Sequence, residues 1–358
     1  MGSQFGRAFR ILTWGESHGP ALGVIIDGCP AGIEVDDALV QRELDRRRVG
    51  QSRVTSPRNE RDRVQILSGV FEGYTTGAPI SLITYNADAD GSKYDIIRNR
   101  FRPGHADYTY HVKYGRRDHR GGGRSSARET WGRVASGAIA KALIQQAGMD
   151  VYAFTTAIGG IESQTFDRDE IERNLVRAAD PIAAEKMTAA IDQIKIDQDS
   201  LGGIVEVRAD NVPVGLGEPT MDKLDALIGQ AMLSIPATKG VEIGRGFEAA
   251  ALRGSTHNDG FFNDGEGRIR TRTNNAGGTL GGISSGEQII ARVAVKPTSS
   301  ISRDQETVTL DGENETIFVE GRHDPCVVPR AVPVVEAMMC LVLADLYLLN
   351  RMSRADWP

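Results

Sequence analysis

Residues 22–44, LGVIIDGCPAGIEVDDALVQREL, and residues 202–228, GGIVEVRADNVPVGLGEPTMDKLDALI, follow one plan. Each begins with an apolar run typical of a strand, passes through a C-P-A-G or V-P-V-G turn, and ends in the pattern of an amphipathic helix. Two stretches that share the order strand, turn and helix indicate two copies of one unit. This pair of segments is the strongest indication of the fold in the sequence.

The rest of the chain alternates between strand and helix patterns without a clear linker. Apolar patterning predicts strands at 9–14, 22–27, 64–71, 79–85, 203–209 and 287–295. Helical spacing predicts helices at 36–48, 126–147, 169–195, 220–233 and 333–351. In both halves a later strand again precedes a long helix. We therefore predict an α+β fold in which the duplicated unit forms a single domain over residues 1–358, with sheets and helices layered against each other.

Charge is distributed unevenly along the chain. The 358 residues carry a formal net charge of -6, which argues against a general polyanion-binding surface. Residues 98–133, however, contain ten arginines and lysines against three acidic residues, and residues 42–63 contain eight arginines against four. The excess positive charge in the first third of the chain indicates a local site for an anionic ligand.

The sequence offers little support for a secreted or membrane protein. Its three cysteines, Cys29, Cys326 and Cys340, are an odd number without CxxC spacing, so we expect neither a disulfide framework nor a structural zinc site. The N-terminal residues lack an apolar signal core. The apolar segment 331–349 is interrupted by Pro333, Glu336 and Asp345 and predicts a buried helix. We expect a cytoplasmic protein that does not enter a membrane.

The predicted helix that begins near Ser126 has the features of an anion site. Ser126 and Glu129 have the spacing of a capping box, and residues 121–123 are three glycines that lead into the helix. Unpaired NH groups at such a helix start attract anions, and Arg124 and Arg128 add full positive charges. A ligand that carries phosphate is therefore expected here, whereas a merely flexible entry loop is the alternative.

Histidines provide candidates for acid–base chemistry. His105, His111 and His119 lie within the cationic run, where neighbouring arginines lower the pKa of an imidazole, and His18 lies in the glycine-flanked turn GESHG. For each of them an exposed or structurally satisfied side chain is an equally good interpretation. His105, Asp107 and His111 lack a third firm ligand at suitable spacing, so we expect no metal site.

Two other classes of function use the same features. An RNA-binding protein would use the arginine run as its electrostatic footprint, but only 6% of the residues are aromatic and available for base stacking. A histidine phosphotransferase would form a covalent phosphohistidine. No GxxxxGK[ST] motif is present, and the nearest match to a dinucleotide fingerprint, at 244–249, lacks the strand-to-helix context.

Eight blocks of sequence resemble the signature segments of the chorismate synthase family. They are GESHGPALGVIIDGCPAGI, LDRRRVGQSR, FRPGHADYTY, RGGGRSSARET, GVEIGRGF, AGGTLGGISSG, KPTSSIS and GRHDPCVVPRAVPVVEAM, in the family's order from about residue 4 to about residue 350. The resemblance implies conversion of 5-enolpyruvylshikimate 3-phosphate into chorismate and phosphate by anti-1,4-elimination, with reduced FMN required but no net redox change. It also implies a β-α-β sandwich with internal pseudo-two-fold symmetry, usually assembled as a homotetramer.

The resemblance assigns catalytic roles residue by residue. His105 in RPGHAD would protonate the leaving phosphate, and His18 in GESHG would act at the reduced flavin. Asp324 in RHDPC would work with the flavin in accepting the ring proton. Ser17 and Ser126 would hold these groups in a proton-relay network.

It also assigns binding residues. The FMN contacts would be Arg124, Ser125, Ser126, Ala237, Gly281, Lys296, Pro297, Thr298, Ser299, Ser300 and Arg322. Pro236 stands where some members have asparagine and offers no NH to a ligand. The substrate, or NADPH in members that reduce their own flavin, would contact Arg47, Arg48, Arg53 and Arg128. No motif separates members that reduce their own flavin from those that rely on an outside reductant.

Overall fold

Two five-stranded antiparallel sheets frame the protein in the computed structural model, which describes residues 2–55, 62–86, 92–319 and 323–355. The first sheet has the order β1 (Gln4–Phe5), β2 (Arg10–Gly15), β3 (Ala21–Asp27), β7 (Ile80–Tyr85) and β4 (Gln65–Ser68). The second has the order β11 (Thr238–Ile243), β16 (Ile289–Val295), β10 (Gly203–Asp210), β8 (Asp150–Ile158) and β9 (Ile161–Glu162). The mixed helix and strand content agrees with the predicted α+β class.

The two sheets share one connectivity. In chain order the first half runs β2, β3, α1 (Asp37–Arg47), β4, β7 and α3 (Thr130–Gln146), and the second runs β8, β10, α5 (Leu224–Leu233), β11, β16 and α7 (Val328–Asn350). The strands lie side by side as β2-β3-β7-β4 in one sheet and as β8-β10-β16-β11 in the other. These four strands and two helices therefore follow the same order in both halves.

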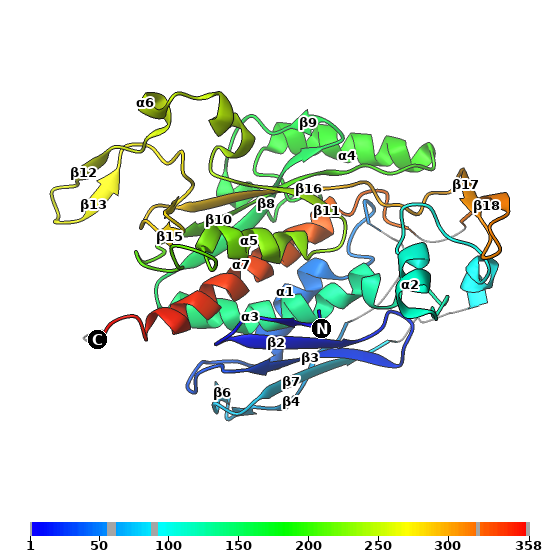
Figure 1. Cartoon of the computed structure of the whole chain (residues 1–358), viewed down its shortest axis with the longest axis horizontal. Helices are drawn as coiled ribbons and strands as arrows, with labels where there is room; N and C mark the ends of the chain where they lie inside the picture. The colour runs from blue at the N-terminus through cyan, green and yellow to red at the C-terminus, as the bar shows by residue number, and fades with distance from the viewer. Residues whose placement is uncertain (1, 56–61, 87–91, 320–322, 356–358) are drawn as a thin grey trace.

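The helices lie between the sheets. Figure 1 shows α1, α3, α5 and α7 as a middle layer, with the first sheet below and the second above. Strand faces that point at this layer are apolar, as in β16, where buried residues alternate with partly exposed ones. Helices α3 and α7 approach so closely at Gly137 that a Cβ there would overlap Ala337. A continuous cluster of buried apolar side chains from Phe9 to Leu346 fills the space between the layers.

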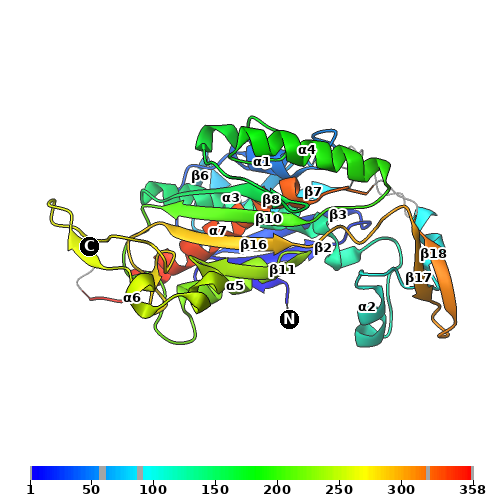
Figure 2. The same cartoon turned by 90° about the horizontal axis from the view of Figure 1, so that it is seen from above.

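Helix α7 is long and apolar enough to be a candidate membrane span, but 83% of its most apolar window is buried inside the fold. The prediction of a buried helix is confirmed. Figures 1 and 2 show α7 running through the middle layer, while α4 (Pro181–Ile196) lies at the β9 edge of the second sheet. The three cysteines are buried and unpaired with one another.

Smaller elements extend from these layers. They are η1 (Ser92–Ile97), α2 (Asp107–Tyr114), η2 (Gly123–Ser125), η3 (Ala127–Glu129), η4 (Arg168–Glu170), η5 (Gly246–Ala251), α6 (Gly254–His257), and the strand pairs β5/β6 (Val70–Phe71, Tyr74–Thr75), β12/β13 (Phe261–Asn263, Ile269–Thr271), β14/β15 (Thr279–Leu280, Ile283–Ser284) and β17/β18 (Asp304–Val308, Asn314–Phe318). In Figure 2, α2 and the β17–β18 hairpin lie together beyond one end of the sandwich.

One predicted helix was wrong over its first part. The helix predicted at 169–195 begins only at Pro181, because Asp180 caps it by accepting hydrogen bonds from the NH groups of Ile182 and Ala183. Before this cap the chain forms the 3-10 helix η4 (Arg168–Glu170) and further turns, and Ala178 forms a bridge with Thr155 of β8. The predicted strand at 64–71 is likewise interrupted at Gly69, which has φ +82°.

Candidate active site

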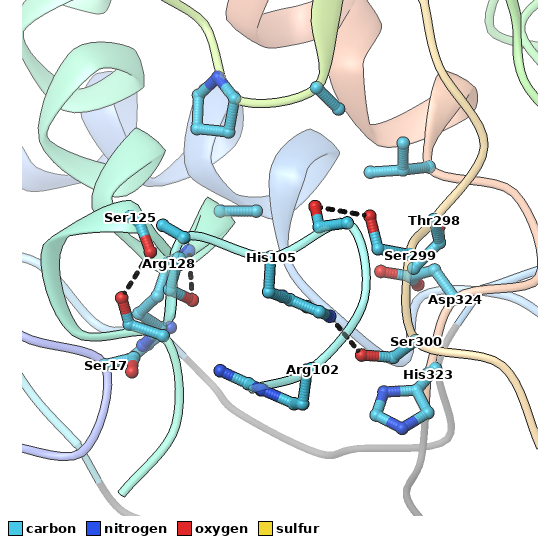
Figure 3. Close-up of a pocket in the computed structure, with 18 of the residues that line it drawn as sticks. Ser17, Arg102, His105, Ser125, Arg128, Thr298, Ser299, Ser300, His323 and Asp324 are labelled. Atoms are coloured by element: carbon cyan, nitrogen blue, oxygen red, sulfur yellow. Dashed lines mark hydrogen bonds between the residues drawn. The ribbon is translucent and has the colours of Figure 1, made fainter. Parts of the chain in front are cut away.

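A cavity of about 400 Å³ opens at the N-terminal ends of α3 and α7. This volume is in the range of small-molecule sites. Its lining comes from separate segments of the chain that meet here. They contribute Ser17, His18, Val49, Tyr94, Arg102, Gly104, His105, Ala106, Gly122, Ser125, Ser126, Ala127, Arg128, Pro236, Ala237, Lys296, Pro297, Thr298, Ser299, Ser300, His323, Asp324, Val327 and Arg330. Figure 3 shows this cavity with His105 near its middle.

His105 is held by the segment 296–300. Its Nε2 lies 2.6 Å from Ser300 Oγ, and Ser299 Oγ donates to the carbonyl of the preceding Gly104 at 2.9 Å. Gly104 has φ +70°, and a Cβ there would lie 2.8 Å from Ser299 Oγ, so the close approach of the two segments requires glycine. Burial, and next the positive charge of Arg102, lower the pKa of His105 to about 4. The imidazole is therefore neutral near pH 7 in the absence of an anionic ligand.

His18 and Ser17 come from the connection between β2 and β3. Ser17 Oγ lies 3.0 Å from His18 Nδ1, which fixes the orientation of the ring. A Cβ on Gly121 would overlap the same ring, so the glycine-rich segment lies directly against His18. The rings of Tyr94 and His18 form a T-shaped contact with centroids 4.8 Å apart. Both predicted residues thus line the same cavity as His105.

Each of the three arginines that line the cavity is paired with an aspartate. Arg102 donates to Asp107 through Nε at 2.8 Å and Nη2 at 2.9 Å, Arg128 pairs with Asp62, and Arg330 pairs with Asp324. Burial alone would raise the pKa of the Asp107 carboxyl, but the Arg102 hydrogen bonds and charge hold it below its usual value. Pairing fixes the guanidinium groups before any ligand enters.

Arg47 lies behind the cavity wall. It is 1% exposed, pairs with Asp62, and donates to the carbonyl of Ala127 at 3.3 Å. Burial, and next the charge of Arg330, lower its pKa to about 10 despite the carboxylate beside it. Its backbone carbonyl accepts from Arg330 Nε at 3.0 Å, so Arg47 supports two of the arginines that line the cavity without lining it itself.

Other predicted binding residues are placed differently. Arg48 lies 3.9 Å from Asp45, and Arg53 pairs with Asp192 at 3.1 Å; neither lines the cavity. Gly281 lies in the turn between β14 and β15, away from it. Arg322 lies outside the described residues.

Arg124 faces β2 and lines a neighbouring cavity of about 690 Å³ that shares Ala106, Gly122, Ser125 and Pro236 with the first. Its Nη1 donates to the carbonyl of Gly15 at 3.1 Å, and its Nη2 donates to Thr13 Oγ1 at 2.7 Å. Ser126 accepts from the NH of Arg128 at 3.3 Å, so the predicted cap is present, but it caps the short η3 turn before α3. Glu129 binds Arg133 instead of completing the capping box.

Much of the cationic run stabilises the loops. Arg117 donates to the carbonyls of Ile97 and Arg100, and Arg120 pairs with Asp118. His119 lies 3.2 Å from Asp95, and His111 packs on Phe101 with ring centroids 5.8 Å apart; both lie outside the first cavity. No group of three side chains suited to a metal occurs in the described residues.

Several residues of the site were not predicted from the sequence: Asp62, Asn86, Tyr94, Arg102 and Arg330. Asp62 and Asn86 both contact Arg128, from positions 66 and 42 residues before it. No motif links such distant positions. The only available signal was the strand prediction at 79–85, which places Asn86 at a strand end, where binding side chains often occur.

The fold and the cavity are those of an α+β enzyme that acts on a small anionic molecule. Histidines, a carboxylate and three arginines line the cavity. The chorismate synthase family model matches residues 9–348. A chorismate synthase from Chloroflexus aggregans is 59% identical over 356 residues, which cover 99% of this chain and 98% of that protein. One from Methanosarcina mazei is 56% identical over 349 residues, which cover 96% and 95%.

A crystal structure of chorismate synthase superposes with a TM-score of 0.78 at 34% identity, covering 97% of this chain and 94% of that one. The chain belongs to the chorismate synthase family. It is accordingly a lyase of the shikimate pathway, which supplies aromatic amino-acid biosynthesis. Family membership favours this activity over the RNA-binding and phosphotransferase alternatives.

Proposed function

We propose that the 400 Å³ cavity binds 5-enolpyruvylshikimate 3-phosphate beside reduced FMN and there eliminates phosphate and a ring proton to give chorismate. The observation that carries this proposal is the convergence of His18, His105 and Asp324 on a cavity lined by three paired arginines. Two carboxylates and a phosphate on the substrate require several guanidinium groups when they leave water.

The residues of the cavity fit an additional phosphate-bearing cofactor. Thr298 Oγ1 is buried at the cavity and has no hydrogen-bond partner among the described residues. Lys296 and the backbone around Ala237 lie beside it, and the Ala237 carbonyl accepts from the NH of Lys296 at 2.9 Å. FMN would be held by Ser125, Ser126 and the segment from Lys296 to Ser300. The family implies Gly281, Arg322 and Arg124 as further contacts, but Arg124 would first have to release its hydrogen bonds to β2. Reduced FMN, when bound, supplies the electron density that helps phosphate leave from a carbon whose neighbouring proton is weakly acidic.

His105 is the proposed donor to the leaving phosphate. Its pKa of about 4 in the absence of ligand means that it holds no proton to give at neutral pH. A bound phosphate dianion and two carboxylates raise this pKa, because opposite charges favour the imidazolium. The acid is therefore charged only when substrate is present, which couples proton donation to binding.

His18 and Asp324 take the remaining roles. Ser17 fixes the ring of His18, which would act at the reduced flavin, and Ser126, the N-cap of η3, lines the same cavity. Asp324 would accept the ring proton, and its pairing with Arg330 orients the carboxylate. Arg128 lines the cavity, and Arg47 lies buried behind its wall. Together with Arg48 and Arg53, these arginines would provide positive charge for binding the substrate or NADPH, one candidate reductant of the flavin.

The finer features of fold and assembly belong to the same proposal. We infer one domain over residues 1–358 with pseudo-two-fold halves, supported by the shared strand order and the continuous core. A homotetramer fits the outer face of the first sheet, where the cross-strand neighbours Leu12 and Ile25 are exposed. We place the protein in the cytoplasm, without nucleic-acid or membrane partners.

The test replaces His105 with alanine and measures chorismate formation under anaerobic conditions with reduced FMN. Turnover should fall about 100-fold or more, the scale for loss of a general acid, while FMN binding persists. His257→Ala, in the distant α6, is the matched control and should retain wild-type turnover. Full activity of His105→Ala would remove His105 from the reaction. Bleaching of the FMN absorbance by NADPH under nitrogen would identify NADPH as the reductant.

A further inference from the structure

Asn86 joins two walls of the cavity through a single amide. Its Nδ2 donates to the carbonyls of Glu16 at 3.1 Å and Gly19 at 2.7 Å, and its Oδ1 accepts from Arg128 Nε at 2.9 Å. Its own backbone NH donates to the carbonyl of Pro20 at 3.1 Å. The carbonyls of Glu16 and Gly19 flank Ser17 and His18, so both sides of that turn are fastened to the residue that follows β7.

Only an amide satisfies these partners. Two carbonyl oxygens on one side require donors, and a guanidinium NH on the other side requires an acceptor. A carboxylate at this position would place an oxygen against two carbonyl oxygens, and an apolar side chain would leave both sides unbonded. The same partners fix the orientation of the amide. If the amide were flipped, its oxygen would face the two carbonyl oxygens and its NH₂ group would face the guanidinium NH of Arg128.

Arg128 is fixed at a second point by Asp62. The Asp62 carboxylate is fully buried and pairs with Arg128 Nη1. The carbonyl of Asp62 also accepts from Trp131 Nε1 at 3.4 Å, which anchors it to the start of α3. Arg128 thus enters the cavity wall with Nε held by Asn86 and Nη1 held by Asp62. Arg128 and Ser17 both line the cavity drawn in Figure 3.

We propose that Asn86 is a positioning residue of the reaction, which holds the His18 turn and Arg128 in one rigid frame. The inference rests on the proposed roles of His18 and Arg128. A shift of about 1 Å in a catalytic group can lower the reaction rate about 100-fold. Asn86 can therefore affect turnover without contacting the substrate, because it fixes the positions of an acid–base residue and a substrate-binding arginine. Asn86 itself does not line the cavity.

Two variants separate the two functions of the amide. Asn86→Asp keeps an acceptor for Arg128 but loses the donors to the turn, so kcat should fall about 10-fold or more while KM for the substrate changes less than about threefold. Asn86→Ala loses both contacts, so kcat should fall and KM should rise as well. This division between kcat and KM would not follow from a general loss of stability.

The matched control is Asn174→Asp. Asn174 Nδ2 also donates to two carbonyls, those of Glu170 and Ala178 at 2.8 Å each, and its Oδ1 accepts from the NH of Ala178, but it does not line the cavity. The Asn174→Asp variant should lose thermal stability and keep the wild-type kcat and KM. Wild-type kcat for Asn86→Asp, or an equal loss for Asn174→Asp, would overturn the proposal. If Asn86→Asp does not fold, Asn86→Ala, which introduces no repulsion, decides by the same criterion: unchanged kcat and KM overturn it.

His18→Ala distinguishes this inference from the proposed function. If His18→Ala is fully active, the role assigned to the turn fails, whatever Asn86 does. If His18→Ala is impaired and both Asn86 variants match the wild type, only the positioning role fails. Hydrogen exchange of the backbone around Gly19 provides a readout independent of turnover, and it should accelerate in Asn86→Asp but not in Asn174→Asp.

Discussion

His105 Nε2 lies 2.6 Å from Ser300 Oγ, and this contact joins equivalent connections of the two halves of the chain. His105 follows β7 on the way to α3, and Ser300 follows β16 on the way to α7. These connections enter the helix layer from corresponding positions in their sheets, so their meeting point lies between the halves. Both connections contribute side chains to the cavity, so neither half of the chain contains the site alone.

Ser300→Ala should reduce turnover by about 10-fold or more, because the imidazole of His105 loses the contact that fixes its ring. Steady-state kinetics with the natural substrate provides the measurement. Ser299→Ala is the comparison variant, since Ser299 holds the Gly104 carbonyl and not the ring. If Ser300→Ala keeps wild-type kcat, the contact does not position His105.

The protonation of His105 should depend on ligand. Its pKa of about 4 lies below the ordinary value for histidine, so the unfolded chain binds a proton between roughly pH 6.5 and 4 that the folded protein does not. Burial of this group consequently lowers stability as the pH falls through that window. NMR titration of the imidazole should show a neutral ring at pH 6 and a higher pKa with substrate bound. An ordinary pKa without ligand would contradict this prediction.

Asp345 should contribute to stability and not to catalysis. Its Oδ1 accepts from the backbone NH groups of Arg7, Ala8 and Phe9 at 2.8, 2.6 and 2.9 Å, which fastens the segment before β2 to α7. Asp345→Asn replaces a charged acceptor with a neutral one and should cost about 1–3 kcal/mol of the free energy of unfolding. Denaturant titration measures the loss, and unchanged KM serves as the internal check. A stability within about 0.5 kcal/mol of the wild type would show that these bonds contribute little.

The sequence predicted β3 well, because its apolar run is bounded by Pro20 and Gly28, and β16, along which buried residues alternate with partly exposed ones. It missed β8, because Tyr152 and Phe154 make its outer face nearly as apolar as its inner face, which removes the alternation. Helix α2 was missed for the opposite reason: Asp107 is its only buried residue, so it has no apolar stripe to detect.

The candidate site divides in the same way. Residues in contiguous motifs, such as His105 and the segment from Lys296 to Ser300, could be named from the resemblance and do line the cavity. Asp62 and Asn86 could not, because each acts on Arg128 from a distant position in the sequence, and only folding brings the partners together. Arg47 shows the reverse case, since an arginine in a matching motif lies buried behind the wall.

Arg124→Lys should affect stability more than cofactor affinity. All three acceptors closest to the Arg124 guanidinium belong to β2: the carbonyls of Thr13 and Gly15, both at 3.1 Å, and Thr13 Oγ1 at 2.7 Å. A lysine ammonium cannot reproduce this planar fork, so the free energy of unfolding should fall by about 1–3 kcal/mol. The dissociation constant of FMN should change less than about threefold, because the donors already point at the strand.

Arg120→Lys is the control for that comparison, since Arg120 is exposed and pairs only with Asp118 among the contacts described. It should leave the stability of the fold unchanged. Denaturant titration and FMN titration of both variants separate the two effects. If Arg124→Lys keeps wild-type stability and loses about 10-fold or more in FMN affinity, the guanidinium must leave β2 when the cofactor binds. The glycines at 121–123 would then be required for that movement as well as for the approach to His18.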